Sequence, residues 1–395
     1  MKKILILGAG IYQVPLIKKA KEMGLYTIVA SYRGPYPGLA LADEVWAVDT
    51  RDSETLLAHS KEANIAGVVT AGTDVAVRSL GIICEKLGLT GLLAESAEIV
   101  TDKALMKEAF VKGQVRTPKA YKVSSLEEAV KAFESINEPV LIKAVDSSGS
   151  RGITKVEKIA ELKAAWQEAL AVSKMDYVLV EKFLLAHEIG VDGFISQGEI
   201  KFMLPHDKFN YARDNVTIPA GHAFPFICTS ELEAEIQLQM ERAVRATRLD
   251  NCAINADVLI TKDKAYILEI GGRAGATCIP ELISIYGDFD YYRQIISYAL
   301  GETPKFSFGE RTDCMAKLLF SETAGSITAI DEKLINELRS ENIQTELDFS
   351  VGDKVEAVKD GTSRIGQVIM RTTDVKELDG MVSKIKGAII IDEKD

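Results

Sequence analysis

Two carboxylates stand in segments that are otherwise apolar. Asp257 lies in INADVLI and Glu269 in AYILEIGGR, and the TKDK between them predicts a hairpin that pairs the two strands. A buried acid pair repels itself unless a cation compensates it, and Mg²⁺ with oxygen ligands is the natural compensation. Asn255, two residues before Asp257, shares its face of the strand and offers another oxygen. In the alternative, one acid faces solvent and the other pairs with Arg273.

A loop of small residues follows a strand that ends near Lys143. The segment DSSGSRG, residues 146–152, joins this strand to another strand and lacks the Gly-Lys-Ser/Thr of a P-loop, which excludes a Walker motif. Its small residues let backbone amides approach an anion, and Lys143 lies a few residues upstream. Taken alone, the segment is equally typical of a flexible hairpin.

The amino-terminal residues carry an incomplete dinucleotide fingerprint. Gly8 and Gly10 follow an apolar run, but the third position of G-x-G-x-x-G is Gln13, and no acid follows the second strand. Arg33 in that place leaves open an NADP-dependent oxidoreductase. A tight turn or a small-substrate crevice is the alternative interpretation.

Charge and composition exclude several classes of protein. The net charge of −11 provides no positive field for nucleic acid or an anionic membrane surface, so we expect neither partner. The five cysteines form no CxxC pair and the four histidines no HxxxH pair, which argues against transition-metal chemistry. The apolar run at the amino terminus is too short for a signal peptide or a membrane span, so we expect a cytoplasmic protein.

The elements that position these residues fall into more than one unit, as 395 residues require. Short apolar runs at 4–7, 26–31, 44–48 and 67–70, with amphipathic helices between them, predict a doubly wound parallel sheet. Residues 70–74 end the fourth strand, where such sheets place a ligand crevice.

A second unit begins near residue 101. Its predicted helices are 101–113, 126–135, 159–172 and 231–245, and its predicted strands are 140–144, 153–156, 177–181, 188–195, 199–205, 252–260 and 264–270. The stretch 206–225 reads as a long irregular segment that walls an acceptor site. After residue 301 we expect a small third unit with a hairpin between 354–357 and 365–370.

In their order along the chain, these segments resemble an ATP-grasp ligase of the branch that includes biotin carboxylase, carbamoyl-phosphate synthetase and purine-biosynthesis enzymes. TDKALMKEAF resembles the family helix that opens with a lysine, here Lys103. PVLIKAVDSSGSRGI resembles the strand lysine, here Lys143, followed by the loop that covers the phosphates. The resemblance assigns four residues of that loop to the nucleotide: Ser148, Gly149, Ser150 and Gly152.

Two later segments complete the resemblance. VLVEKFLLAHEIGVDGF resembles the adenine hinge, with Glu188 at the ribose and three residues at the base, Glu181, Lys182 and Phe183. INADVLI and YILEIGGRAGAT resemble the metal-bearing strands, which implies Asp257, Glu269 and Asn255 as metal ligands. Arg273 would reach the reacting phosphate, and it shares the catalytic role with Lys143.

The resemblance implies an α/β and α+β multidomain protein with an ATP-grasp fold. We expect a doubly wound pre-ATP-grasp domain at 1–100, an ATP-grasp domain at 101–305 and a small closing domain at 306–395. The ATP-binding lobe would cover about 115–185 and the metal-bearing lobe about 186–305. It also implies a homodimeric ligase that uses ATP and Mg²⁺, or Mn²⁺, to activate a small carboxylate as an acyl phosphate and couple it to an amine.

One position departs from the family pattern. Many relatives have Glu-x-Asn before the arginine and use the asparagine oxygen as a metal ligand, whereas this chain has Gly271. Asn255 or water can replace that ligand, or a single Mg²⁺ is held loosely. The substitution also leaves open a regulator that binds ATP without catalysis.

Overall fold

The computed structural model describes residues 1–147, 152–213 and 216–393, which form two compact units. The first unit contains Met1–Met203, Ile227–Ala274 and Ile295–Pro304, and the second contains Leu204–Phe226, Gly275–Gln294 and Lys305–Asp395. In the part of the chain that the structure describes, no helix has the length and apolar character needed to cross a membrane. The three domains expected from the sequence stay a prediction.

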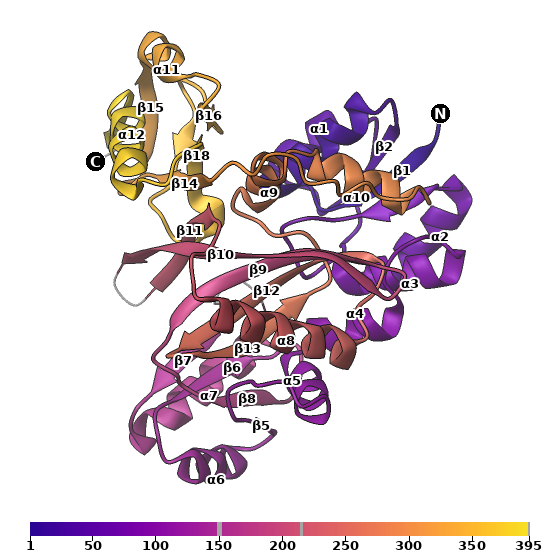
Figure 1. The fold of residues 1–395 in the computed structure, drawn as a ribbon, viewed down its shortest axis with the longest axis vertical. Coiled ribbons are helices and arrows are strands. Elements are labelled where there is room, and N and C mark those ends of the chain that lie inside the picture. The colour runs from indigo at the N-terminus through magenta and orange to yellow at the C-terminus, as the bar shows by residue number, and fades with distance from the viewer. Residues whose placement is uncertain (148–151, 214–215, 394–395) are drawn as a thin grey trace. The chain divides into compact units, whose positions relative to one another are not determined.

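The first unit opens with a four-stranded parallel sheet, as predicted. Its order is β3 (Glu44–Trp46), β2 (Tyr26–Ala30), β1 (Lys3–Leu7) and β4 (Gly67–Val69). Figure 1 labels its strands β1 and β2 near the amino terminus. Residues 4–7 are fully buried because both faces of the sheet are covered. The helices between its strands are η1 (Ile11–Gln13), α1 (Val14–Glu22), η2 (Pro37–Leu41) and α2 (Ser53–Ala63), and α3 (Val77–Leu87) and α4 (Ala94–Thr101) follow β4.

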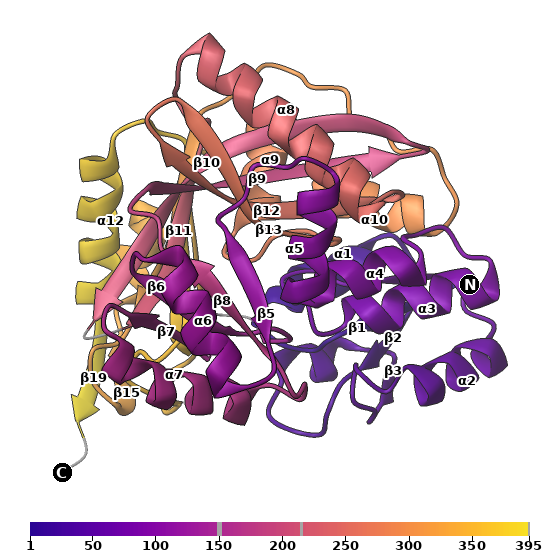
Figure 2. The same ribbon diagram turned by 90° about the horizontal axis from the view of Figure 1, so that it is seen from below.

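A second sheet of this unit is antiparallel. Its order is β5 (Ala120–Val123), β8 (Val178–Lys182), β6 (Val140–Ala144) and β7 (Ile153–Val156). Helices α6 (Leu126–Ile136) and α7 (Ile159–Val172) lie side by side and bury an apolar core against it (Figure 2). The structure confirms the predicted bounds of β6, β7 and α7.

The strands that carry the acids form the third part of the first unit. β9 (His187–Ser196) pairs with β12 (Cys252–Thr261), which forms a hairpin with β13 (Lys264–Gly271) as predicted. Helix α8 (Ser230–Thr247) packs along β13, and α5 (Lys103–Lys112) packs on α8 (Figure 1). The register places Asp257 opposite Glu269 and Asn255 opposite Gly271.

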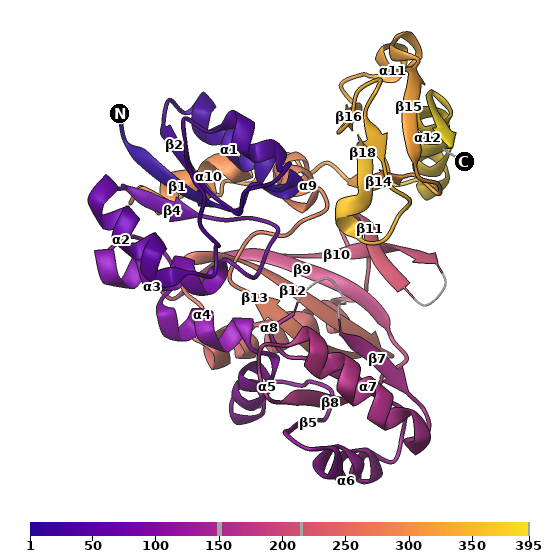
Figure 3. The ribbon, with the colours of Figure 1, turned by 180° about the vertical axis from the view of Figure 1, so that it is seen from behind.

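The second unit contains the remaining strands and helices. β10 (Glu199–Arg213) enters it from the first unit and pairs with β11 (Val216–Phe224), which is followed across the sheet by β14 (Cys314–Phe320), β18 (Arg364–Met370) and β16 (Ile343–Leu347) (Figure 3). A smaller sheet consists of β17 (Lys354–Val355), β15 (Gly325–Ile330) and β19 (Ile389–Glu393). The helices are α9 (Ile279–Gly287), α10 (Tyr291–Ala299), which ends in the first unit, α11 (Glu332–Leu338), η3 (Gly361–Ser363) and α12 (Val375–Gly387).

Two predictions were wrong in this second unit. The stretch 206–225 is not irregular, since most of it belongs to β10 and β11. Prolines and polar residues on both faces hid these strands, because strand propensity yields to pairing in the folded protein. The expected hairpin between 354–357 and 365–370 is absent among the described residues, because β17 pairs with β15 while β18 pairs with β14 and β16.

Packing at Gly81 gives a first testable prediction. A side chain there would place its Cβ 2.7 Å from Ala97 Cβ and 3.0 Å from Leu93 O, so α3 and α4 can approach only with glycine. Gly81→Val should lower the free energy of unfolding by about 1–3 kcal/mol, the usual cost of overpacking. The control is Gly380→Ala in α12, which meets nothing within 4 Å and should stabilise by about 0.5–1 kcal/mol. Thermal unfolding midpoints that move in the same direction would contradict this account.

Candidate active site

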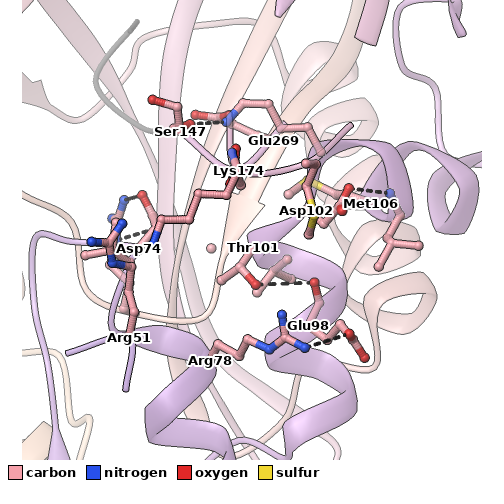
Figure 4. Close-up of a pocket in the computed structure, with 18 of the residues that line it drawn as sticks. Arg51, Asp74, Arg78, Glu98, Thr101, Asp102, Met106, Ser147, Lys174 and Glu269 are labelled. Carbon is pink, nitrogen blue, oxygen red and sulfur yellow. Dashed lines mark hydrogen bonds and ion pairs between the residues drawn. The ribbon is translucent and has the colours of Figure 1, made fainter. Parts of the chain in front are cut away.

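A cavity of about 570 Å³ lies within the first unit. One part of its wall comes from the acid-bearing strands and from α5, and another comes from the amino-terminal residues. In Figure 4, Glu269 and Ser147 mark one end of the view, and the ion pair of Arg78 with Glu98 marks the other. The residues with charged or polar chemistry that line the cavity include Arg51, Ser53, Asp74, Arg78, Glu98, Asp102, Lys103, Ser147, Lys174, Asn255, Asp257, Glu269 and Arg273.

The two predicted acids meet at this cavity. Asp257 and Glu269 are direct cross-strand neighbours, so their Cβ atoms are about 4.5–5.5 Å apart by sheet geometry. Lys103 begins α5 beside them: its Nζ lies 3.5 Å from Glu269 Oε2 and donates to Ser147 O at 2.6 Å. Residues 1–147, 152–213 and 216–393 contain no group of three or more His, Cys, Asp or Glu that could hold a metal ion. The acid pair would therefore leave positions for other oxygen ligands.

Arg273 is anchored by a chain of hydrogen bonds. Its Nε lies 2.8 Å from Asp74 Oδ1, and its Nη2 donates to Asp74 Oδ2 at 2.9 Å. Its Nη1 donates to Asn255 Oδ1 at 2.6 Å, and Asn255 Nδ2 donates to the buried Asp192 at 2.8 Å. Burial alone would lower the pKa of Arg273, but Asp74 outweighs it and raises that pKa further. Arg273 thus pairs with Asp74 rather than with Glu269.

Asp74 also fills the space beside Gly271. A Cβ at Gly271 would lie 2.9 Å from Asp74 Oδ1, too close for any side chain unless Asp74 moved. Asn255 lies opposite Gly271 in the sheet, and its side-chain oxygen accepts a hydrogen bond from Arg273. A carboxylate from the loop after β4 therefore lies where a side chain at position 271 would begin.

Three buried charged residues, Lys107, Lys143 and Glu181, form a cluster of ion pairs. Glu181 is fully buried, and its Oε2 lies 2.6 Å from Lys107 Nζ, while its Oε1 accepts a short hydrogen bond from Lys143 Nζ. Burial would raise the pKa of Glu181, but the two ammonium groups outweigh it and hold that pKa below its ordinary value. Burial lowers the pKa of Lys107, which Glu181 partly offsets. The cluster contains one more cation than anions.

The residues expected around an adenine do not line this cavity. The backbone amides of Lys182 and Phe183 donate to Lys119 O and Pro139 O, both at 2.8 Å, so the fold already uses them. Lys155 Nζ lies 4.4 Å from the Phe183 ring centroid. Glu188 lies half-buried on β9, opposite Leu259. Their contact with a nucleotide stays a prediction.

The small-residue loop is described only at its ends. Ser148, Gly149 and Ser150 lie outside the described residues. Ser147 lines the cavity, and Gly152, with φ of 68°, accepts a 2.8 Å hydrogen bond from Ala144 N. A positive φ favours glycine at this end of the loop.

The glycine pair at the amino terminus is not free for a dinucleotide. Gln13 Oε1 accepts from Gly10 N at 2.8 Å, and Gln13 Nε2 donates to Ala71 O at 2.5 Å. The Gln13 side chain is 5% exposed and would lie 2.9 Å from a Cβ at Gly8. The amide that a pyrophosphate would need is occupied, which argues against the oxidoreductase alternative.

Sequence reasoning missed three residues of this centre. Asp74 ends the predicted crevice 70–74, so its position was available as a signal. Lys107 follows Lys103 by four residues, a spacing that places both on one helix face. Asp192 interrupts an apolar strand, which is the same signal that singled out Asp257. Arg51 and Arg78 carry no comparable signal in the sequence.

Comparison with known proteins finds one family model and whole-chain structural relatives. The model described as ATP-grasp domain matches residues 136–281. The crystal structure of phosphoribosylglycinamide synthetase from Anaerococcus prevotii is 30% identical, with a TM-score of 0.81 and 100% of each chain covered. The biotin carboxylase domain of Hydrogenobacter thermophilus 2-oxoglutarate carboxylase, a dimer crystallised with MgADP, has a TM-score of 0.80 at 18% identity and covers 99% of this chain and 90% of its own.

One curated relative is similar in sequence to part of this chain. Alanine–anticapsin ligase from Bacillus subtilis is 23% identical over 271 residues, which are 61% of this chain and 57% of the ligase. The chain thus spans little more than half the length of this relative.

The anchoring of Arg273 gives a second prediction. Asp74→Asn keeps the size of the side chain but removes the charge and one acceptor of the paired hydrogen bonds. Since the Arg273 side chain is only 12% exposed, we expect the free energy of unfolding to fall by about 1–3 kcal/mol. Glu98→Gln is the control, because both partners of its ion pair with Arg78 are about half exposed and the loss should stay below about 0.5 kcal/mol. Equal losses in urea titrations followed by circular dichroism would show that Asp74 does not anchor Arg273.

Proposed function

The chain belongs to the ATP-grasp family, and we propose that it is an ATP-dependent ligase that joins a substrate carboxylate to an amine. One observation carries the proposal: a single cavity contains the cross-strand acids Asp257 and Glu269 together with Lys103 and Arg273. These are the groups that phosphoryl transfer needs, since it depends on positioning and charge neutralisation more than on covalent help. The relatives named as ligases support the same class.

The acid pair fits Mg²⁺. Protein sites for Mg²⁺ at nucleotides commonly use one or two carboxylates and leave the other positions to phosphate oxygens and water. Asp257 and Glu269 would supply those carboxylates, and Mn²⁺ accepts the same oxygen ligands. When bound, the metal neutralises and orients the transferring phosphate. Asn255 would hold Arg273 rather than the metal, because its oxygen already accepts from that guanidinium.

The proposed reaction has two steps. A carboxylate oxygen attacks the γ-phosphorus of ATP, the bond to the β-phosphate oxygen breaks, and ADP leaves with an acyl phosphate remaining. The amine then attacks the carbonyl carbon, phosphate leaves, the amine loses a proton and the amide is formed. ATP and the carboxylate bring about five negative charges together, which Lys103, Lys143 and Arg273 would offset.

The loop 146–152 would close over the phosphates. Its small residues allow close backbone approach, and closure excludes water that would hydrolyse the acyl phosphate. Glu181, Lys182 and Phe183 would lie at the adenine and Glu188 at the ribose, following the family resemblance. Because the hinge amides are bonded within the fold, the base would meet carbonyl and side-chain groups there.

The relatives narrow the first substrates to test. One is named for alanine and another for phosphoribosylglycinamide, so we propose an amino acid as carboxylate or as amine. We also propose a homodimer, as in the biotin carboxylase neighbour, which sedimentation or light scattering would test. Use of ATP favours the cytoplasm as the place of action.

A substrate panel tests the function directly. Purified protein is incubated with Mg²⁺, ATP and pairs of amino acids, small carboxylic acids and amines, and phosphate release is measured with and without each pair. Release that depends on both substrates and on Mg²⁺ supports the ligase. ATP binding without release across the panel would favour the catalytically silent regulator instead.

Two variants locate the chemistry, which gives a third prediction. Glu269→Gln and Lys143→Ala should each lower substrate-dependent ADP release by about 10²- to 10³-fold, as when one stabilising group of a transition state is removed. Glu108→Gln is the matched control, because Glu108 lies on the exposed face of α5 and should leave turnover unchanged. Circular dichroism verifies the fold of each variant. Normal ADP release by either variant would remove that residue from the mechanism.

A further inference from the structure

Lys107 has no role in the proposed reaction, yet it is a buried lysine within a charged cluster. Its side chain is 8% exposed, and its Nζ contacts Glu181 Oε2 at 2.6 Å and donates to Thr117 Oγ1 at 2.5 Å. Such burial of an ammonium group is costly and needs compensation. Glu181 supplies it, but Glu181 also compensates Lys143.

The cluster of Lys107, Lys143 and Glu181 contains more positive than negative charge. Lys107 and Lys143 contribute two positive charges, while Glu181 contributes one negative charge, and all three are at least nine-tenths buried. Among the described residues, neither lysine forms an ion pair with a second carboxylate. The three buried side chains therefore carry a net charge of +1. Glu269 also acts electrostatically on Lys107, but its ion pair is with Lys103.

The pairing of Lys143 with Glu181 affects whether Lys143 can bind a phosphate of ATP. The proposed function requires Lys143 to contact ATP, but its ion-pair partner in the described structure is Glu181. If Lys143 were the only counter-ion, its departure would leave a fully buried carboxylate uncompensated, at strong cost. Lys107, which is already bonded to the other oxygen of Glu181, keeps that carboxylate compensated when Lys143 leaves.

We propose that Lys107 is a positioning residue for the nucleotide: it keeps Glu181 neutralised and so releases Lys143 to bind a phosphate of ATP. The inference rests on the proposed function, because it takes ATP as the incoming anion. Lys107 itself stays on Glu181 and Thr117. Lys103, one turn earlier on α5, contacts Glu269 and Ser147 instead.

The inference predicts a coupling between Lys107 and Glu181 in ATP affinity. Lys107→Met should raise the dissociation constant for Mg-ATP by about 10- to 100-fold, the size expected for one charge-assisted hydrogen bond. In a protein that already carries Glu181→Gln, Lys107→Met should change the dissociation constant for Mg-ATP by less than about threefold. The reason is that Lys143 is then no longer held by an anion. Isothermal titration calorimetry measures all four proteins.

Controls separate this role from others. Lys112→Met, at the exposed end of α5, should leave ATP affinity unchanged. The unfolding midpoint of Lys107→Met without nucleotide should be equal or higher, since Glu181 and Lys143 stay paired and one buried cation is removed. A loss of affinity that persists in the Glu181→Gln background would make Lys107 a direct phosphate ligand and overturn the inference.

Other outcomes also decide the matter. A fall in the nucleotide-free midpoint that accounts for the lost affinity would make Lys107 merely structural and overturn the inference. Normal affinity in Lys107→Met, with ATP bound by the unsubstituted protein, would overturn it while leaving the ligase proposal intact. If the unsubstituted protein does not bind ATP, the proposed function is wrong, and this inference is wrong with it.

Discussion

The pairing of β12 with β13 sets the electrostatic problem that the first unit must solve. Because Asp257 and Glu269 are opposite one another on paired strands, two carboxylates lie side by side in this part of the sheet. Like charges at this spacing disfavour joint ionisation unless cations compensate them. The protein supplies Lys103 at the start of α5, and the incoming metal would supply the rest. Helix α8 packs on β13 and α5 packs on α8, an arrangement that brings Lys103 at the start of α5 to Glu269.

Each cation near this part of the sheet is held by an acid from a different part of the chain. Arg273 is fixed by Asp74, 199 residues away in sequence, and by Asn255, which is fixed in turn by Asp192. Lys143 and Lys107 share Glu181. Such networks keep long side chains in one arrangement and reduce the entropy lost when a ligand binds.

The sequence predicts the local elements better than their long-range contacts. The hairpin of β12 and β13 and the bounds of β6, β7 and α7 follow from periodicity and turn residues, which are local signals. The strand character of 206–225 was missed because pairing, not propensity, decides it. The ion pair of Asp74 with Arg273 and the choice of Glu181 as partner for Lys107 depend on how distant segments pack. No spacing along the chain encodes them.

Gly271 illustrates how a departure from a family pattern becomes interpretable only in three dimensions. In the sequence, it reads as a lost metal ligand and raises the possibility of a silent regulator. In the structure, Asp74 occupies the space that a side chain at this position would need, and it binds the arginine two residues further on. Asp74 carries a full negative charge beside this position, and Arg273 neutralises that charge. In the proposed ligase, Asp257 and Glu269 would therefore be the metal-binding groups, and the loop after β4 orients Arg273 through Asp74.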